Sequence, residues 1–213
     1  MYIDETEITR LIQYSEVNNM YDPDIIFDFF SRSNDTPYPG EGIGEKIKPL
    51  YKERYSDLSK IPNWRKKLSN FWVQPFIIDE LKWASVEHYY QACRFKINNP
   101  GFYFMFSLNS NSDLSKDPAF AKKAAEKRAT KYRGILVRDK SIKIDETFYN
   151  INNEIMFKAQ YAKFTQNEDL RNLLLSTYDA KLNHTVIYSD RKSETEIFEN
   201  LMIIRSIISN CNK

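Results

Sequence analysis

The chain has 213 residues, and its 31 Lys and Arg residues against 29 Asp and Glu residues give a formal net charge of +2. That length suits one hydrophobic core and one domain, and the small net charge argues against nucleic-acid binding over the whole surface. No apolar run approaches the roughly eighteen residues of a membrane helix, and the first residues lack the pattern of a secretory signal. We therefore expect a soluble, cytoplasmic protein.

Cysteine and histidine are too scarce to suggest a metal site. The cysteines are Cys93 and Cys211, and the histidines, His88 and His184, lie far apart in the chain. This set supplies neither a disulfide framework nor the ligand spacing of a zinc site. We predict no metal and no cofactor, so any chemistry should use carboxylates, amides and amines.

The N-terminal part predicts an accessory helix, a strand and a glycine-rich loop. Asp4 can cap the helix, and residues 1–24 form this helix and a linker. Ile25–Phe30 is aromatic and β-branched, which predicts a strand. A polar loop then leads to Pro39–Glu45, which holds three of the five glycines: Gly40, Gly42 and Gly44.

Clustered glycines indicate a sharp turn or a close approach to a ligand. The spacing lacks the third glycine of a dinucleotide-binding fingerprint, and Glu41 and Glu45 would oppose an anion. A turn is therefore favoured over a phosphate cradle. Gly40 and Gly42 stay candidates for contact with a substrate.

The segment from Leu68 to Phe95 is the densest in recognition chemistry, with an amide, indoles, a carboxylate and several aromatic rings. This mixture suits a ligand with a flat ring, a sugar and charge. An aromatic-rich helix packed into a core is the alternative. Within the segment, Phe76–Ile78 and Leu81–Trp83 predict a hairpin, although its turn at Asp79-Glu80 lacks glycine.

Ser85 predicts the start of a helix after the hairpin. Steps of three and four residues predict a face toward the core made of Val86, Tyr89, Tyr90, Cys93 and Ile97. Glu87, Gln91 and Arg94 then form an adjacent polar stripe that is available to a ligand.

The next region is rich in lysine and arginine. Asp117 caps a helix that begins at Pro118 and extends to about Lys131, and Ile142–Ile144 predicts a short strand. The basic residues are Lys122, Lys123, Lys127, Arg128, Lys131, Arg133, Arg138, Lys140 and Lys143. They could form an edge that faces phosphate or an ordinary solvated helix surface.

The C-terminal part is helical. Helices are predicted over Phe148–Phe164 and Glu168–Thr177, the second with Leu170, Leu173 and Leu174 facing inward. Ser193 with Glu196 forms a capping-box pattern for a last helix, whose apolar face would be Ile197, Leu201, Ile204 and Ile208. Because helices outnumber strands, the predicted class is mainly α with a few short β-strands (α+β).

Four motifs, in order, resemble the NADAR family, whose name refers to NAD and ADP-ribose. They are Ser69–Phe71, Trp83–Phe95 with the pattern Trp-x-Ser-x-Glu-His-Tyr-Tyr-Gln-Ala-x-x-Phe, Ala162–Phe164, and Leu174–Leu182. The resemblance covers about residues 26–208 and implies a single multihelical N-glycosidase-like domain over residues 1–213. The glycine loop is similar to that of longer, virus-type members.

Family members include N-glycosidases that act on riboflavin-pathway intermediates and enzymes that remove ADP-ribose from guanine in nucleic acid. The resemblance therefore implies a hydrolase of a ribosyl N-glycosidic bond, with ADP-ribosylated guanine in nucleic acid as the expected substrate. The alternatives are a non-catalytic module that binds ADP-ribose or another nucleotide, and a hydrolase of phosphoribosylamino riboflavin-pathway intermediates. The expected partner is an ADP-ribose-containing nucleotide or ADP-ribosylated nucleic acid, without a membrane or a metal.

Two departures from the family pattern bear on the site. Compact members carry a Trp-Gly turn before the last helix, whereas Asn183–Ser193 contains neither residue, so one wall of the ligand site is missing or rebuilt. The lysine that is common before Phe in the central helix is Arg94 here, which keeps the charge but cannot act as a nucleophilic amine.

Cleavage of an N-glycosidic bond leaves positive charge on the anomeric carbon, which a carboxylate can stabilise. We expect Glu87 to do this as an ionised base. The helix dipole would lower its pKa by less than about one unit, unless deep burial outweighs it. Lys163 is a second catalytic candidate, because a buried neutral amine could attack the anomeric carbon.

The remaining candidates would bind the substrate. Asn70 and Gln91 would hydrogen-bond the base or ribose, and Phe71 and Trp83 would stack on the ligand or wall the pocket. Arg94 would approach a phosphate. For Phe71 and Trp83, packing in the core is an equal alternative.

Overall fold

The structure is a computed structural model that describes residues 6, 20–33, 38–127, 131–186 and 193–211. It contains two compact units, Met1–Trp72 with Phe164–Lys213, and Val73–Lys163. The helix predicted near Asp4 lies outside the described residues. Short sheets combine with more numerous helices, so the predicted α+β class is confirmed.

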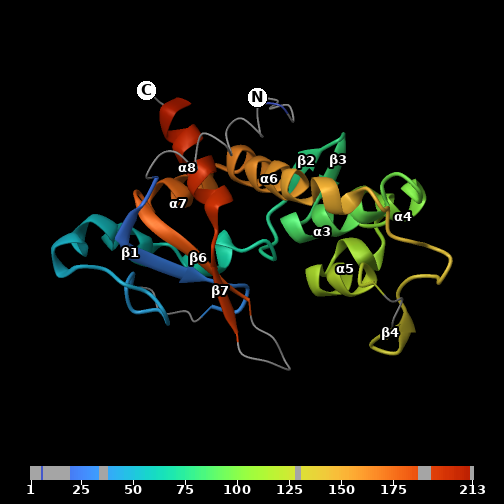
Figure 1. Cartoon of the computed structure of the whole chain (residues 1–213), viewed down its shortest axis with the longest axis horizontal. Helices are drawn as coiled ribbons and strands as arrows, with labels where there is room; N and C mark the ends of the chain where they lie inside the picture. The colour runs from blue at the N-terminus through green and yellow to red at the C-terminus, as the bar shows by residue number, and fades with distance from the viewer. Residues whose placement is uncertain (1–5, 7–19, 34–37, 128–130, 187–192, 212–213) are drawn as a thin grey trace. The chain divides into compact units, whose positions relative to one another are not determined.

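The first unit is built on a three-stranded sheet in the order β1-β6-β7, formed by β1 (Asp22–Phe29), β6 (Ala180–Val186) and β7 (Glu194–Ile197). β1 pairs with β6 in parallel and β6 with β7 antiparallel (Figure 1). The predicted strand at Ile25–Phe30 is confirmed, with an earlier start. Its alternate residues Ile25, Phe27 and Phe29 are buried, which is the period of a strand with one face on a core.

The helices of this unit are α2 (Trp64–Leu68), α7 (Glu168–Leu175) and α8 (Glu199–Cys211), with 3-10 helices η1 (Pro49–Tyr51) and η2 (Glu53–Lys60). Leu170, Leu173 and Leu174 are fully buried, so the predicted inward face of α7 is confirmed. The edges of the Tyr55 and Trp64 rings meet the Phe27 ring, with centroids 5.2 and 5.4 Å away.

The prediction for the start of the last helix was wrong. Glu196 lies in strand β7, and α8 begins only at Glu199. Ile197 pairs with Asn183 in the sheet, and its side chain is 40% exposed. The tertiary partner β6 therefore overrides the local capping pattern, while Leu201, Ile204 and Ile208 are buried as predicted.

The second unit consists of short elements around one core. They are β2 (Phe76–Ile78), β3 (Leu81–Trp83), α3 (Val86–Ala92), η3 (Cys93–Phe95), α4 (Pro100–Phe104), η4 (Leu108–Ser110), η5 (Asp113–Ser115), α5 (Pro118–Ala124), β4 (Lys131–Tyr132), β5 (Ile135–Leu136) and α6 (Phe148–Gln166), whose last three residues belong to the first unit. Its core is strongly aromatic: the rings of Phe95, Phe102 and Phe106 contact one another.

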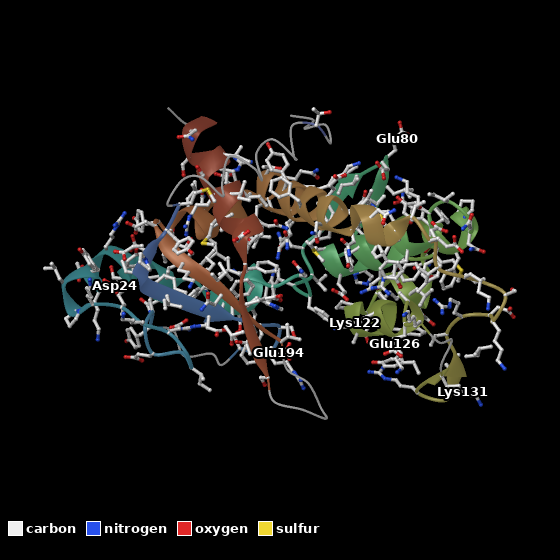
Figure 2. All side chains as sticks on the ribbon, in the orientation of Figure 1. Asp24, Glu80, Lys122, Glu126, Lys131 and Glu194 are labelled. Carbon is white, nitrogen blue, oxygen red and sulfur yellow. The ribbon has the colours of Figure 1, made fainter. Side chains whose placement is uncertain are left out.

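The predicted hairpin is confirmed, with β2 and β3 joined at Asp79-Glu80. Both turn residues have positive φ, 53° and 62°, which is the backbone conformation that a two-residue turn usually obtains with glycine. Glu80 lies at the tip (Figure 2). The Asp79 carboxylate accepts from Lys96 and Lys158 at 2.7 and 3.1 Å, and from two tyrosine hydroxyls, those of Tyr89 and Tyr103, at 3.4 Å.

The cap of α3 is confirmed, because the Ser85 hydroxyl accepts from the His88 backbone N–H. Val86, Tyr89 and Cys93 are buried as predicted, whereas Ile97 is 65% exposed, because the helical phase ends at the 3-10 turn η3. The polar stripe is also more enclosed than expected: Glu87 and Gln91 are each 5% exposed.

Helix α5 is shorter than predicted. Asp117 caps it and Pro118 begins it as expected, but it ends at Ala124. The next carbonyls are taken by arginines: Arg94 donates to the Ala125 carbonyl at 3.0 Å, and Arg138 to the Glu126 carbonyl at 2.7 Å. These side chains replace the backbone donors that another helical turn would supply.

The strand predicted at Ile142–Ile144 was wrong, because this segment is not paired with any described strand. Instead the Lys143 carbonyl accepts from the Asn99 side chain at 3.2 Å, and the Asp145 N–H donates to the Arg94 carbonyl at 2.7 Å. Side-chain and turn contacts use the backbone groups that a neighbouring strand would need.

None of the helices that the structure describes is both long enough and apolar enough to cross a membrane.

Candidate active site

Glu87 and Gln91 are brought together by helix α3. They are four residues apart, so their side chains lie on the same face, and the Gln91 Nε2 donates to the Glu87 Oε1 at 2.8 Å. Both side chains are buried. The Gln91 Oε1 is also buried and has no hydrogen-bond partner in the part of the chain that the structure describes. A ligand N–H or O–H could satisfy that acceptor.

Burial raises the pKa of Glu87, while the Gln91 hydrogen bond and the nearby charges of Lys122 and Arg94 act in the opposite direction. The expected small lowering by the helix dipole is therefore outweighed, because the carboxylate has lost nearly all of its water. Lys122 extends from α5 (Figure 2). It lies 35 residues further along the chain, so helical spacing within α3 gave no signal of its proximity.

Arg94 is held by the protein itself. Its Nη1 donates to the Ala125 carbonyl at 3.0 Å, and the guanidinium carbon lies 5.1 Å from the centroid of the Phe148 ring. This geometry suits a cation over an aromatic face. The Nε is buried and without a hydrogen-bond partner among the described residues. A donor is therefore available for an anion, and the predicted phosphate contact stays a prediction.

Lys163 lies near the end of α6 and is fully buried. Burial lowers its pKa from 10.5 to about 7. At neutral pH roughly half of such amines carry no proton, and a neutral amine is a nucleophile. Lys163 therefore has the electrostatic environment that the sequence-based hypothesis requires, although its catalytic role stays a prediction.

Trp83 and His88 are packed in the core beside this site. The Trp83 indole donates to the Ile78 carbonyl at 3.0 Å, and its ring meets Tyr89 edge-on. His88 contacts the Ser85 hydroxyl through Nδ1 at 2.8 Å, and burial lowers its pKa to about 4, so the imidazole is neutral. Trp83 thus supports the base of α3, while its predicted contact with a ligand stays untested.

The glycine loop of the first unit surrounds a carboxylate of the protein. The backbone N–H groups of Gly40 and Gly42 both donate to the Glu45 Oε2 at 2.9 Å. Arg65 completes the arrangement, with its Nε 2.6 Å from Oε1 and its Nη2 2.7 Å from Oε2. The loop amides that could have received a substrate anion therefore bind Glu45, and contact of Gly40 and Gly42 with a substrate stays a prediction.

Asn70 and Phe71 follow the end of α2 in the first unit, and both are partly exposed. The candidate residues are thus divided between the units, with Glu87, Gln91, Arg94, Trp83 and Lys163 in the second. The roles of Asn70 and Phe71 stay predictions. Across the described residues, no three His, Cys, Asp or Glu side chains are grouped so that they could hold a metal ion.

The comparisons with known proteins agree with the motifs. The chain resembles N-glycosidase YbiA of Escherichia coli K12, with 29% identity over 118 residues, 55% of this chain and 61% of that protein. It is 28% identical to YbiA of Shigella flexneri over the same shares. The chain thus spans about 61% of the length of these curated relatives.

The NMR structure of E. coli YbiA has a similar fold, with a TM-score of 0.55 at 20% sequence identity, and the match covers 93% of each chain. At that identity the likeness concerns the fold alone. The sequence model of the NADAR domain matches residues 56–190, which is more than half of the chain. The chain therefore belongs to the NADAR domain family.

Proposed function

We propose that this protein is an N-glycosidase that hydrolyses a ribosyl N-glycosidic bond, and that its substrate is ADP-ribosylated guanine in nucleic acid. The observation that carries the proposal is the buried Glu87 carboxylate with its hydrogen bond from Gln91. A buried carboxyl group whose pKa is raised suits proton transfer near neutral pH. The relatives from E. coli and Shigella flexneri are named N-glycosidases, which supports the reaction class.

In the direct route, Glu87 accepts a proton from water while the water oxygen attacks the anomeric carbon. The bond between that carbon and the base nitrogen breaks, and its electron pair leaves on the base, which then takes up a proton. The ionised carboxylate also stabilises the positive charge that develops on the sugar. Gln91 holds the carboxylate in place and presents its free oxygen to the ligand.

In the covalent route, the neutral Lys163 amine attacks the anomeric carbon and the base departs with the bonding electron pair. The sugar ring then opens by cleavage of its own carbon–oxygen bond, and the ring oxygen takes up a proton as the amine nitrogen loses its own. The resulting Schiff base is hydrolysed by water, which restores the lysine. The burial that lowers the pKa of Lys163 favours this route.

The choice of substrate rests on the lysines and arginines between Lys122 and Lys143. A phosphodiester strand gains from such charges, whereas a small riboflavin-pathway intermediate has little use for them. The absence of Trp and Gly from Asn183–Ser193 favours the second candidate, a module that binds ADP-ribose without cleaving it. Turnover separates the two.

The test is incubation of the full chain with DNA that carries ADP-ribosyl-guanine, ADP-ribosylated protein and riboflavin-pathway intermediates. We expect release of ADP-ribose from the DNA, and a rate at least about 100-fold lower in Glu87→Gln, because a positioned acid or base contributes about that much. Glu80→Gln is the matched control, since Glu80 is exposed at the hairpin tip. Near-normal turnover by Glu87→Gln would refute the role of Glu87.

Borohydride reduction during turnover distinguishes the routes. A stable adduct on Lys163, absent from Lys163→Met and retained in Lys158→Met on the same helix, would establish the covalent route. Turnover without an adduct would establish water attack. Tight binding without release from any substrate would overturn the hydrolase and favour the module.

A further inference from the structure

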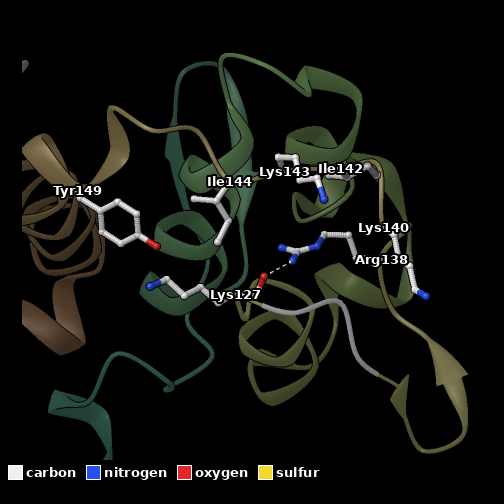
Figure 3. Close-up of a pocket in the computed structure, with 7 residues that line it drawn as sticks. All are labelled: Lys127, Arg138, Lys140, Ile142, Lys143, Ile144 and Tyr149. Carbon is white, nitrogen blue, oxygen red and sulfur yellow. Dashed lines mark hydrogen bonds between the residues drawn. The ribbon is translucent and has the colours of Figure 1, made fainter.

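A cavity of about 500 Å³ in the second unit is lined almost entirely by cationic and apolar side chains. Its cations are Lys127, Arg138, Lys140 and Lys143, and its other lining residues are Ile142, Ile144 and Tyr149 (Figure 3). No lining residue is acidic. The volume falls in the range of small-molecule sites, which extends from about 300 to 1,000 Å³.

Arg138 is the one buried cation of the cavity, at 4% exposure. Its Nη2 is occupied by the Glu126 carbonyl, but its Nε and Nη1 are buried and have no hydrogen-bond partner among the residues that the structure describes. Figure 3 shows the guanidinium directed into the space toward Ile144. These two nitrogens lie on different edges of the planar guanidinium, so each can donate one charge-assisted hydrogen bond to an anion.

The neighbouring carboxylates are hydrogen-bonded to other groups, although the charge of Lys140 acts on Asp139. Asp145 accepts from the backbone N–H groups of Ile97 and Asn98, and Asp139 accepts from Ser141. Across the described chain, none of the four lining cations forms an ion pair. Their mutual repulsion is unfavourable, and an anion in the cavity would relieve it.

We propose that this cavity binds the phosphate of a nucleotide, with Arg138 as the central ligand and Lys127 and Lys143 beside it. The half-exposed ring of Tyr149 and the side chain of Ile144 offer apolar surface to the part of the ligand that adjoins the phosphate. The phosphate belongs either to a free nucleotide or to a nucleic-acid strand. The identity of the ligand as a nucleotide rests on the proposed function, whereas phosphate binding needs no turnover.

Arg94 links this cavity to Glu87 electrostatically. Its charge acts on the Glu87 carboxylate and also on the Arg138 guanidinium. A bound phosphate would offset the positive charge around Arg94. Occupancy of the cavity would therefore also alter the electrostatic environment of Glu87.

The test is calorimetric titration of the full chain with inorganic pyrophosphate and, separately, with a short single-stranded oligonucleotide lacking terminal phosphates. Saturable binding of pyrophosphate alone assigns the cavity to a free nucleotide. Saturable binding of the oligonucleotide assigns it to a strand. Lys127→Gln combined with Lys143→Gln should weaken the binding about tenfold or more, because hydrogen bonds between charged partners contribute at least that much.

The matched control combines Lys52→Gln with Lys60→Gln, which removes the same charge from exposed positions in the first unit and should leave the affinity unchanged. The Nε–H resonance of Arg138, assigned by its loss in Arg138→Lys, should shift when pyrophosphate is added. Equal weakening in both double variants, an unmoved Arg138 resonance or no saturable binding of either probe would overturn the proposal. Pyrophosphate binding without N-glycosidase activity would leave the cavity assignment standing while the proposed function falls.

Discussion

Replacing Lys163 by methionine should stabilise the protein at neutral pH. The side chain is fully buried, and burial lowers its pKa from 10.5 to about 7. The unfolded chain therefore binds the proton more tightly than the folded chain, so this lysine destabilises the fold at low pH and loses that effect as pH rises from 7 to 10.5. Methionine has a similar length and no proton to bind.

The size of the effect follows from the two pKa values. At pH 7 the lysine should cost about 4 kcal/mol, and at pH 9 about 2 kcal/mol, since one pKa unit corresponds to about 1.36 kcal/mol. The substitution also removes contacts of the lysine with its surroundings, which offsets part of this gain. The loss of those contacts is nearly the same at both pH values, so it largely cancels in the change with pH.

Urea unfolding of wild type and Lys163→Met between pH 6 and 9.5 measures the difference directly. We expect the advantage of the variant to shrink by about 2 kcal/mol from pH 7 to pH 9. Lys52→Met, at an exposed position, should show a difference that does not vary with pH. A pH-independent difference for Lys163→Met would refute the buried neutral amine.

Three further outcomes are expected. Gly40→Ala should lower the free energy of unfolding in the same urea assay by more than about 1–2 kcal/mol, because Gly40 has φ +87° and an added Cβ would lie 2.2 Å from Ile47. Gly101→Ala in α4 is the control, because an added Cβ there meets open space and the change should be neutral or stabilising. Burial raises the pKa of Asp28 from 3.8 to about 6, so the fold loses stability as pH rises through this interval. In thermal unfolding above pH 6, Asp28→Asn should be more stable than wild type by up to about 3 kcal/mol. A gain in stability already present at pH 3.5 would contradict this cause. Burial raises the pKa of the Cys93 thiol to about 12. In a Cys211→Ser variant, a disulfide reagent should therefore react with Cys93 only after the protein unfolds. Rapid labelling of Cys93 in the native protein would contradict its burial.

Local patterns in the sequence were sufficient for the hairpin and the start of α3. A two-residue turn between apolar runs and a serine cap involve neighbours within four residues, so the sequence contains all the interacting parts. The short α5 was not predictable in this way. The carbonyls of Ala125 and Glu126, just after its end, accept from Arg94 and Arg138, which come from outside the helix.

The sheet and the site show the same division. Strand β6 pairs with β1 in register from Ile26 opposite Lys181, a contact between distant parts of the chain that periodicity does not encode. The helical phase of α3 correctly placed Glu87 and Gln91 on one face. It could not reveal that this face is buried, because the covering side chains come from other elements, and this burial reverses the expected direction of the pKa shift.

Asp79 has a consequence for the order in which the second unit folds. Three of its partners, Tyr89, Lys96 and Tyr103, lie within 24 residues, while Lys158 lies 79 residues away. The entropy of closing a loop grows with its length, so the three local contacts can form while the chain is still open. The hairpin, α3 and α4 would then gather around one carboxylate before α6 arrives, and Asp79→Asn should slow refolding more than it speeds unfolding.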